Sequence, residues 1–486
     1  MATYATRLTA NRHKIKLGYA PTRRNIFSKE DAAKYKRLTE EKLKGWGIEL
    51  ITIDWLNEEG LLYDAADAPK IAQRFKEENV DAVFSPHCNF GTEDAVAKLA
   101  KIMGKPFLLW GPRDEAPLPD GMRLRDTQCG LFATSKILRR LRVPFTYIVN
   151  SRLNDPVFER GVKNFLAASA VVKAFRNLRI GQISTRPAAF WTVMVNEGEL
   201  LERFGIEIVP ISLVEIVNSV NSRIAKNDTN LKTTVEEFKG KVEFHNIDDE
   251  IIKRIAALKL TMEEWATGEG CSAIAIQCWS ALQDALGIMP CFANAELTDA
   301  GLPVVCETDI HGAVSAIMAQ AARMGETPIF FADLTIRHPD NDNAELIWHC
   351  GPFPLSLKAE NSPHARVDRN YTQENGCPGV CEWQIRGGDI TITRFDGDGG
   401  QYSLLMGHGR GVDGPMTRGT YVWVEVNDWP KWEEKFIKGP YIHHVACVHG
   451  NVAPVLYEAT RYIPGLKADP VDPGEEEIAA WLRGEG

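Results

Sequence analysis

Three ionisable residues stand at the ends of three consecutive apolar runs in the middle of the chain. Glu307 follows the run 303–306, Asp333 ends the run 328–333, and His349 ends the run 345–349. Short apolar runs of this kind predict buried β-strands, and ligands of open α/β sheets bind at strand ends. Carboxylate and imidazole groups together suit Mn²⁺, Mg²⁺ or Fe²⁺. The sequence therefore predicts a divalent metal site built from these side chains.

Each of these residues also has an ordinary structural explanation. Glu307 or Asp333 caps a following helix in that interpretation, and His349 is a hydrogen-bonded core histidine. Their joint occurrence favours the metal site, because charged groups directly after buried strands must be solvated, paired or coordinated. On an extended segment Glu307, Asp309 and His311 would face the same way, so these three compete for the ligand role.

Two further groups of candidates lie outside the three runs. His443 and His444 are adjacent, and neighbouring residues on a strand point to opposite faces, so we expect at most one of them to enter a site. Arg23 and Arg24 follow the first predicted strand, where guanidinium groups can hold substrate oxygens or a phosphate. Surface arginines explain the second pair equally well.

The predicted elements that position these residues change character along the chain. Strands and helices alternate from residue 15 to 150 and again from about 177 to 349, which predicts two doubly wound, Rossmann-like α/β domains. Beyond His349 glycine and proline become frequent, and strands at 389–395, 401–407 and 420–426 predict a β-rich, antiparallel, barrel-like domain. We place the three domains at 1–170, 171–350 and 351–486.

Composition excludes several classes of function. The 486 residues are 44% hydrophobic and 25% charged, as in soluble globular proteins. A formal net charge of -9 argues against a nucleic-acid partner. Residues 1–14 lack the apolar core of a signal peptide, and no apolar run reaches the ~20 residues needed to span a bilayer. We therefore expect a cytoplasmic protein without a membrane segment. No G-x-G-x-x-G follows the first strand, which argues against a dinucleotide.

The motifs resemble those of the L-fucose isomerase/L-arabinose isomerase superfamily. The resemblance is carried by the segments 306–313 (CETDIHGA), 331–333 (FAD), 348–352 (WHCGP) and the pair His443–His444. Their order and separations match the superfamily along the second and third domains. Asp333 stands where the arabinose branch has Glu and the fucose branch has Asp, so the chain resembles a divergent, fucose-isomerase-like member.

The resemblance implies roles for the candidate residues. Glu307 and Asp333 become metal ligands and the acid/base pair, and His444 matches the late metal histidine. His349 matches a further histidine that the arabinose branch places at the metal, so we expect it among the ligands. The substrate-binding residues implied are Arg23, Arg24, Asn89, Gln277, Trp279 and His443.

The implied activity is that of a ketol isomerase, an intramolecular oxidoreductase of carbohydrate metabolism. A Mn²⁺-type ion, or Mg²⁺, Fe²⁺ or Co²⁺, assists the isomerisation of an open-chain aldose to a ketose through an ene-diol. A deoxy or 6-modified hexose is expected, and a sulfonated or phosphorylated one would give Arg23, Arg24 or Arg113 an anion to bind. The superfamily implies a homo-oligomer, a hexamer or another trimer-based assembly. A non-catalytic sugar-binding or sensing protein, and a metal-dependent epimerase or lyase, are the alternatives.

Overall fold

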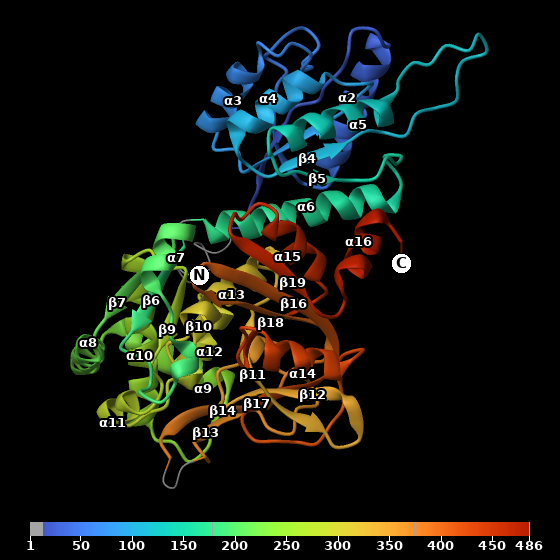
Figure 1. Cartoon of the computed structure of the whole chain (residues 1–486). Helices are drawn as coiled ribbons and strands as arrows, with labels where there is room; N and C mark the ends of the chain where they lie inside the picture. Colours follow the sequence, from blue (N-terminus) through green and yellow to red (C-terminus); the bar gives the residue numbers. More distant parts are fainter. Residues whose placement is uncertain (1–12, 177, 373–375, 486) are drawn as a thin grey trace. The chain divides into compact units, whose positions relative to one another are not determined.

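The computed structural model describes residues 13–176, 178–372 and 376–485, and the chain forms two compact units. The smaller unit contains residues 14–173, 457–464 and the C-terminal residues from 476. The larger unit contains residues 174–456 and 465–475. Figure 1 shows both units coloured along the sequence.

The smaller unit is built on a five-stranded parallel sheet of order β2-β1-β3-β4-β5. Helices α2 to α6 alternate with or follow its strands (Figure 1), as the sequence predicts for a doubly wound domain. The strands are β1 (Lys16–Tyr19), β2 (Glu49–Thr52), β3 (Ala82–Pro86), β4 (Phe107–Trp110) and β5 (Thr146–Tyr147). The helices are α2 (Lys29–Gly45), α3 (Ala68–Glu77), α4 (Glu93–Met103), α5 (Thr127–Arg140) and α6 (Pro156–Phe175), with α16 (Glu475–Arg483) at the end of the chain.

The larger unit contains a four-stranded parallel sheet of order β10-β9-β6-β7. Its strands are β6 (Arg179–Ile183), β7 (Glu207–Ile211), β9 (Ala273–Ile276) and β10 (Val304–Val305). The helices of this region are α7 (Glu197–Phe204), α8 (Leu213–Lys226), α9 (Thr229–Lys241), α10 (Asp249–Gly268), α11 (Ala281–Leu286), α12 (Cys291–Asp299) and α13 (Ile310–Ala322), with a 3-10 turn η1 (Trp191–Val193). The second α/β pattern of the sequence is thus confirmed.

The same unit holds a ten-stranded sheet of order β19-β16-β15-β18-β11-β12-β17-β14-β13-β8. An added pairing of β16 with β17 closes six of its strands into an antiparallel barrel. The barrel strands are β11 (Phe330–His338), β12 (Asn341–His349), β15 (Gly388–Asp398), β16 (Gln401–Val412), β17 (Thr420–Glu425) and β18 (His444–His449). The remaining elements are β8 (Glu243–Phe244), η2 (Leu355–Leu357), β13 (Arg366–Arg369), β14 (Pro378–Gln384), α14 (Trp429–Lys438), α15 (Ala453–Thr460) and β19 (Leu466–Pro470).

The hydrophobic core of the larger unit continues from the parallel sheet into the barrel. Ile276 beside α13 and Ile347, Val422 and Val445 in the barrel belong to one cluster of buried apolar side chains. The strands β11 and β12 precede residue 351 yet belong to the barrel sheet, because both pair with barrel strands on either side. The three-domain division stays a prediction, and residues 174–456 form a single compact body.

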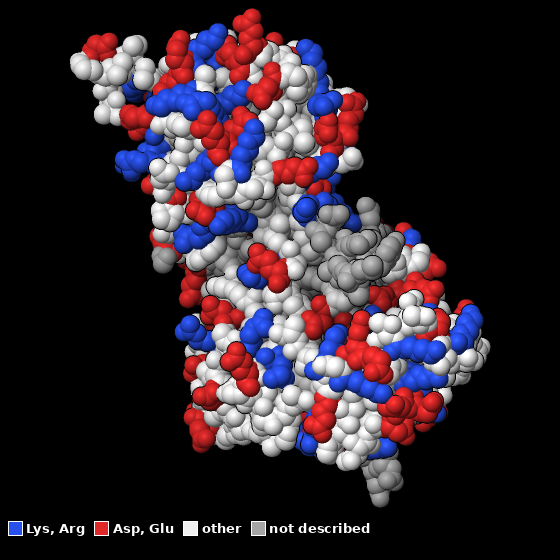
Figure 2. All heavy atoms as spheres, turned by 180° about the vertical axis from the view of Figure 1, so that it is seen from behind, with Lys and Arg blue, Asp and Glu red and all other residues white. Residues whose placement is uncertain are grey.

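Two further global features bear on the partners that the sequence predicts. Within the described residues no helix is both long and apolar enough to cross a bilayer. On the face shown in Figure 2, Lys and Arg side chains are interspersed with Asp and Glu, and no broad basic surface is visible there. No disulfide joins any of the ten cysteines, all of which lie in the described residues.

Candidate functional site

A tight loop between the parallel sheet and α13 presents the first carboxylate. β10 ends at Val305, and Glu307 and Thr308 then adopt left-handed backbone conformations with φ of 60° and 58°. Asp309 is the N-cap of α13, and its Oδ1 accepts a hydrogen bond of 2.8 Å from the amide of Gly312. The expected extended segment across residues 307–311 is therefore wrong, because the chain turns at Glu307 and enters the helix at Ile310.

The second carboxylate comes from the barrel and not from a strand end. β11 continues through Asp333 to His338, so the predicted end of this strand at Asp333 is wrong. The cause is tertiary: β11 is held on both sides, and Asp333 lies opposite Trp348 of β12 and opposite His444 of β18. Antiparallel register therefore brings Asp333 and His444 together.

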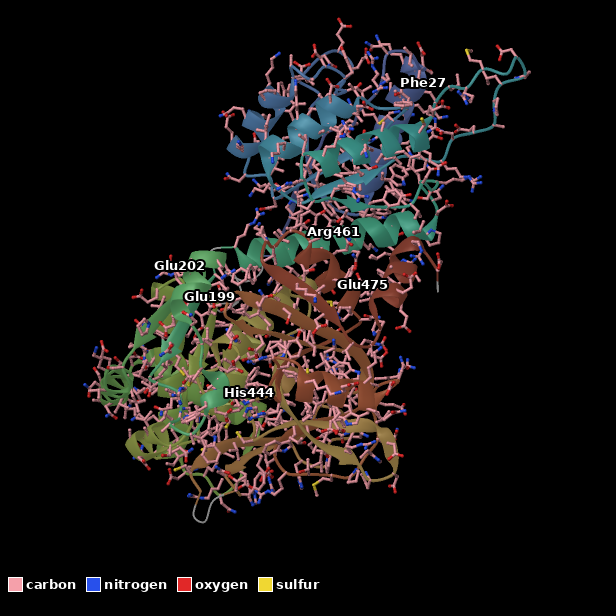
Figure 3. All side chains as sticks on the ribbon, viewed as in Figure 1. Phe27, Glu199, Glu202, His444, Arg461 and Glu475 are labelled. Carbon is pink, nitrogen blue, oxygen red and sulfur yellow. The ribbon has the colours of Figure 1, made fainter. Side chains whose placement is uncertain are left out.

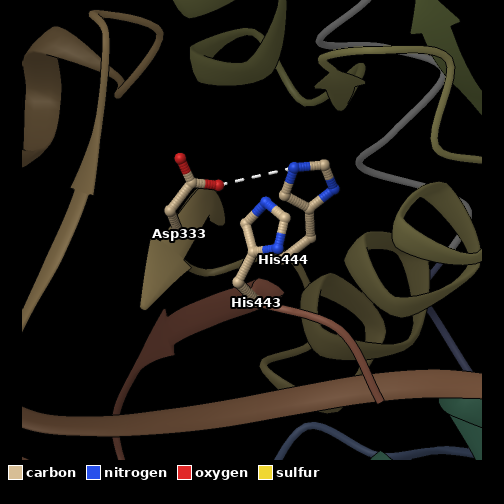
Figure 4. A group of neighbouring side chains, drawn as sticks. All are labelled: Asp333, His443 and His444. Carbon is tan, nitrogen blue, oxygen red and sulfur yellow. Dashed lines mark ion pairs between the residues drawn. The ribbon is translucent and has the colours of Figure 1, made fainter. Parts of the chain in front are cut away.

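Asp333, His443 and His444 offer ligand atoms that all lie within 4.8 Å of one another. Figure 4 shows the Asp333 carboxylate directed at the ring of His444, with the His443 ring beside it. The ring centroids of the two histidines are 4.5 Å apart. Both histidines thus reach the cluster, against the expectation for adjacent strand residues, because His443 precedes the first residue of β18.

His444, which is labelled in Figure 3, is the central residue of the site. It is 1% exposed. Its Nε2 lies 2.7 Å from Oε2 of Glu307 and 3.4 Å from Oδ1 of Asp333, and its Nδ1 lies 2.9 Å from Oδ2 of Asp309. Burial alone would lower the pKa of His444, but the hydrogen bonds to Asp309 and Glu307 raise it to about 9. The same contacts lower the pKa of Glu307 against the opposing effect of burial.

Behind Asp309 lies a fully buried guanidinium. Arg394 donates from Nη2 to Oδ1 of Asp309 at 3.1 Å, pairs also with Oδ2 of Asp309, and donates from Nε to Asp396 at 2.8 Å. Nδ1 of His311 lies 3.0 Å from Oδ1 of Asp396. Although burial favours the neutral acid, the charge of Arg394 holds the pKa of both carboxyls below the usual range. The positive charge of Arg394 is thus neutralised by Asp309 and Asp396. Among the described residues, Glu307 and Asp333 form ion pairs with His444 and with no Arg or Lys.

These residues fit a divalent cation. Nε2 of His444 lies 2.7 Å from Oε2 of Glu307 and 3.4 Å from Oδ1 of Asp333, so an imidazole nitrogen and two carboxylates converge at one point. Two carboxylates that share one site repel each other unless a positive charge lies between them. The donors are carboxylate oxygens and imidazole nitrogen, which hard and borderline divalent ions accept. A carboxylate on the far nitrogen of a metal histidine is the usual orienting partner, and Asp309 holds that position.

His349 ends β12 and is 2% exposed. Its Nδ1 accepts a hydrogen bond of 2.9 Å from the backbone amide of Cys350, and its Nε2 is buried without a partner among the described residues. Burial lowers the pKa of His349, but Cys350, Asp333 and Glu307 outweigh burial and raise it. His349 is absent from the described group whose ligand atoms all lie within 4.8 Å, so its predicted place among the ligands stays a prediction.

Gln277 and Trp279 follow β9, next to the Glu307 loop. The amide of Thr308 donates to the carbonyl of Ile276 at 3.1 Å, which joins the two loops. Gln277 is half-buried, and its Oε1 accepts a hydrogen bond of 2.8 Å from Ser184 Oγ. Both residues therefore lie at the carboxyl edge of the parallel sheet that also carries Glu307, and their binding of substrate stays a prediction.

Arg23, Arg24 and Asn89 lie in the smaller unit and have partners there. Arg23 donates twice to Glu59, at 2.5 and 3.0 Å, and stacks 4.1 Å from the centre of the Tyr63 ring. Asn89 is fully buried, and all its hydrogen bonds serve the loop: Oδ1 accepts from the Arg24 amide at 2.8 Å and Nδ2 donates to the Arg24 carbonyl at 3.2 Å. These contacts give both residues a structural role, and their binding of substrate stays a prediction.

Sequence reasoning missed Arg394 altogether. A single arginine interrupts the alternating strand Ile390–Phe395, and a buried arginine on an apolar strand must have acidic partners. That pattern was the available signal, but its partner Asp309 lies 85 residues away in the chain.

Comparison with known proteins points to one group of enzymes. Residues 18–176 match the family described as fucose/sulfoquinovose isomerase, N-terminal domain. Sulfoquinovose isomerases from Priestia aryabhattai and Priestia megaterium are each 26% identical over 457 residues, which cover 92% of this chain and 97% of theirs. That of Alkalicoccus urumqiensis is 25% identical over 455 residues, or 91% of this chain and 96% of its own. A periplasmic solute-binding protein from Actinobacillus succinogenes with bound D-allose aligns at 15% identity over 65% of this chain and 93% of its own, with a TM-score of 0.17, too low to support any inference.

Proposed function

We propose, from the premise that the chain belongs to the fucose-isomerase-like superfamily, that it is an aldose–ketose isomerase acting on a 6-sulfonated hexose. Relatives over almost the whole chain are named sulfoquinovose isomerases. The observation that carries the proposal is the cluster in which Glu307 and Asp333 converge on Nε2 of the buried His444. Sulfoquinovose, a glucose with a sulfonate in place of the 6-hydroxyl group, is the proposed substrate and the matching 2-ketose the product.

Glu307, Asp333 and His444 would hold a Mn²⁺-type ion, with His443 close enough to take part. When bound, such an ion supplies Lewis acidity at the carbonyl oxygen and the neighbouring hydroxyl oxygen of the open-chain sugar. Asp309 fixes the ring of His444 through Nδ1 and leaves Nε2 directed at Glu307 and Asp333. Arg394 keeps Asp309 ionised, so this orientation persists at neutral pH.

The reaction moves one proton between neighbouring carbons. A carboxylate of the Glu307 and Asp333 pair removes the proton from C2, the double bond shifts to C1–C2 and an ene-diol forms. Return of a proton to C1, with transfer of the O2 proton to O1, gives the ketose.

A sulfonated substrate needs a cationic partner near the cluster. Arg394 is neutralised by two carboxylates and is 0% exposed, so it cannot serve. Arg186 lines a cavity of about 460 Å³ beside the Glu307 loop, together with Thr185 and Thr308. Its guanidinium donates only to backbone carbonyls, those of Pro187 and Ala188, and pairs with no carboxylate among the described residues. We assign Arg186 to the sulfonate, since guanidinium groups bind such oxyanions through paired donors.

The proposal is tested with purified protein stripped of metal by a chelator. Sulfoquinovose is added in D₂O, with and without Mn²⁺, and the sugar carbons are followed by NMR. The expected result is a 2-ketose, formed only after metal is restored, with exchange of hydrogen at C1 or C2. Binding without turnover would favour a sugar-binding protein, and inversion at C2 without a ketose would favour an epimerase. Full activity in the chelated protein would overturn the metal assignment.

A further inference from the structure

A cavity of about 460 Å³ lies between the barrel and helix α14. Figure 1 shows α14 beside β12, against which it packs. Residues of β11, β12 and α14 and of the segment in front of β18 line the cavity. Most of its wall is apolar, and the apolar lining residues are Leu334, Trp429, Phe436, Ile437, Tyr441 and Ile442. Cavities of this volume with apolar and aromatic walls hold small organic molecules in proteins.

One carboxylate in the wall of this cavity has no partner. Glu345 of β12 is 5% exposed, and its Oε2 is buried without a hydrogen bond. Among the described residues no ion pair involves Glu345. Burial of an unpaired carboxylate costs free energy, and the same burial raises the pKa of Glu345 to about 7. A positive charge in the cavity would remove this cost.

The chain itself does not supply that positive charge. Arg337 stands opposite Glu345 in the register of β11 and β12 and lines the same cavity. Its Nη2, however, donates to the carbonyl of Asp342 and lies 3.7 Å from Oδ1 of the same residue. Glu433 of α14 adds a second carboxylate to the lining and raises the pKa of Glu345 further. His443 is the remaining lining group that titrates near neutral pH.

We propose that this cavity binds a small organic cation, an ammonium group on an apolar or aromatic body, with the ammonium group against Glu345. A buried carboxylate is a strong partner for an ammonium group. The rings of Trp429 and Phe436 supply apolar contact area, and the faces of aromatic rings attract cations.

A sulfonated sugar does not fit this cavity. Its negative charge would be repelled by Glu345 and Glu433, and its hydroxyl groups would find few polar partners on a mostly apolar wall. The cavity is therefore a second binding site, different from the one that we assign to the sugar. The inference does not rest on the proposed function, and its test uses no sugar.

The test uses 2-phenylethylamine as the probe and 2-phenylethanol as an uncharged molecule of nearly the same shape. Binding of each to the purified wild-type protein is measured by calorimetry at about pH 8, where the amine is protonated and Glu345 is mostly ionised. We expect the amine to bind at least tenfold more tightly than the alcohol. Glu345→Gln keeps the shape of the side chain and removes its charge, so it should abolish this preference.

Glu433→Gln is the matched control, because Glu433 lines the same cavity from an exposed position. This variant should weaken binding of the amine less than about threefold, since an exposed charge contributes little. The thermal midpoint without any probe is the second measurement. Glu345→Gln should raise it, because the substitution removes a buried carboxylate that has no partner.

Three results would overturn the proposal. The first is equal binding of the amine and the alcohol by the wild type, or binding of neither. The second is a lower thermal midpoint in Glu345→Gln, which would show that Glu345 already has a partner in the free protein. The third is a shift of Glu345→Gln to a smaller species in analytical ultracentrifugation, because a second copy of the chain would then supply the positive charge.

Discussion

Each unit contains a cluster of polar side chains, and the two clusters differ in how completely their hydrogen-bonding groups are paired. Around Arg23 and Asn89 in the smaller unit, the donors and acceptors named above are paired within the chain. Around His444 in the larger unit, two carboxylates crowd on the single nitrogen Nε2 of His444, and the buried Nε2 of His349 has no hydrogen-bond partner among the described residues. Folding alone explains the first cluster. The second is stable only if something else supplies partners, which distinguishes a candidate binding site from a well-packed loop.

The largest effect on activity is expected when one negative charge is removed from the cluster around His444. Glu307→Gln keeps the shape of the side chain and removes a base and an anionic ligand. We expect kcat on sulfoquinovose to fall about 10³-fold or more, the scale of a lost general base. The measurement is ketose formation by NMR with saturating Mn²⁺. Retention of more than a tenth of the activity would show that Glu307 does not move the proton.

A smaller effect is expected at Asp309, which contacts the other ring nitrogen of His444. Asp309→Asn preserves a good N-cap for α13 but weakens the orienting partner of His444 and leaves Arg394 half-neutralised. Mn²⁺ affinity should fall about 10- to 100-fold, as measured by calorimetry on the metal-free protein. Asp396→Asn is the matched control, because Asp396 contacts Arg394 and His311 but not His444. Equal losses in both variants would indicate general loosening of the network.

The next prediction concerns Arg186, which we assign to the sulfonate group of the substrate. Arg186→Met should raise KM for sulfoquinovose at least tenfold, because a charge-assisted pair with the sulfonate contributes about 1.5 to 3 kcal/mol. The parameters for 6-deoxyglucose, which has no anionic group, should stay unchanged. Initial rates with both sugars give the ratio. A parallel loss on the two sugars would mean that Arg186 supports the fold of its loop and not recognition of the sulfonate.

The smallest effect on activity is expected in the paired cluster. Arg23→Leu leaves the largely buried carboxylate of Glu59 with Lys29 as its remaining partner. We expect a loss of about 1 to 3 kcal/mol in unfolding free energy, visible as a lower thermal midpoint, with kcat and KM unchanged. Arg24→Leu, at the more exposed neighbouring position, is the control. A raised KM without lost stability would show instead that Arg23 contacts the sugar, as the sequence predicts.

Local signals in the sequence predicted most of the elements correctly. Ser28, a favourable N-cap residue in front of α2, has its Oγ accept from the Asp31 amide at 3.0 Å. The alternation of strands and helices predicted both parallel sheets, and the glycine-rich C-terminal pattern predicted the barrel. Glu307 and Asp333 were named from their places after apolar runs and His444 through a family resemblance, and the structure brings the three together.

The failures are those in which distant residues decide the local conformation. Nothing near Asp333 indicates that its strand continues, because β12 and β18 hold it from both sides. The turn at Glu307 and Thr308 is invisible to patterns that assume ordinary backbone angles. The role of Arg394 follows from its ion pairs with Asp309 and Asp396, which only the folded chain brings beside it. The metal, the assembly and the cellular location stay predictions.

The two left-handed residues at Glu307 and Thr308 have a consequence for engineering this protein. Non-glycine residues in that conformation cost roughly 1 to 2 kcal/mol each, and a β-branched threonine is among the least suited to it. A search for heat-resistant variants would therefore find Thr308→Gly attractive, since it relieves the backbone. The same change would make the backbone next to Glu307 more flexible, and the Glu307 carboxylate would be held less firmly beside His444. Thr308→Gly should consequently raise the thermal stability and lower the turnover rate. Selection for thermal stability alone would therefore reduce activity.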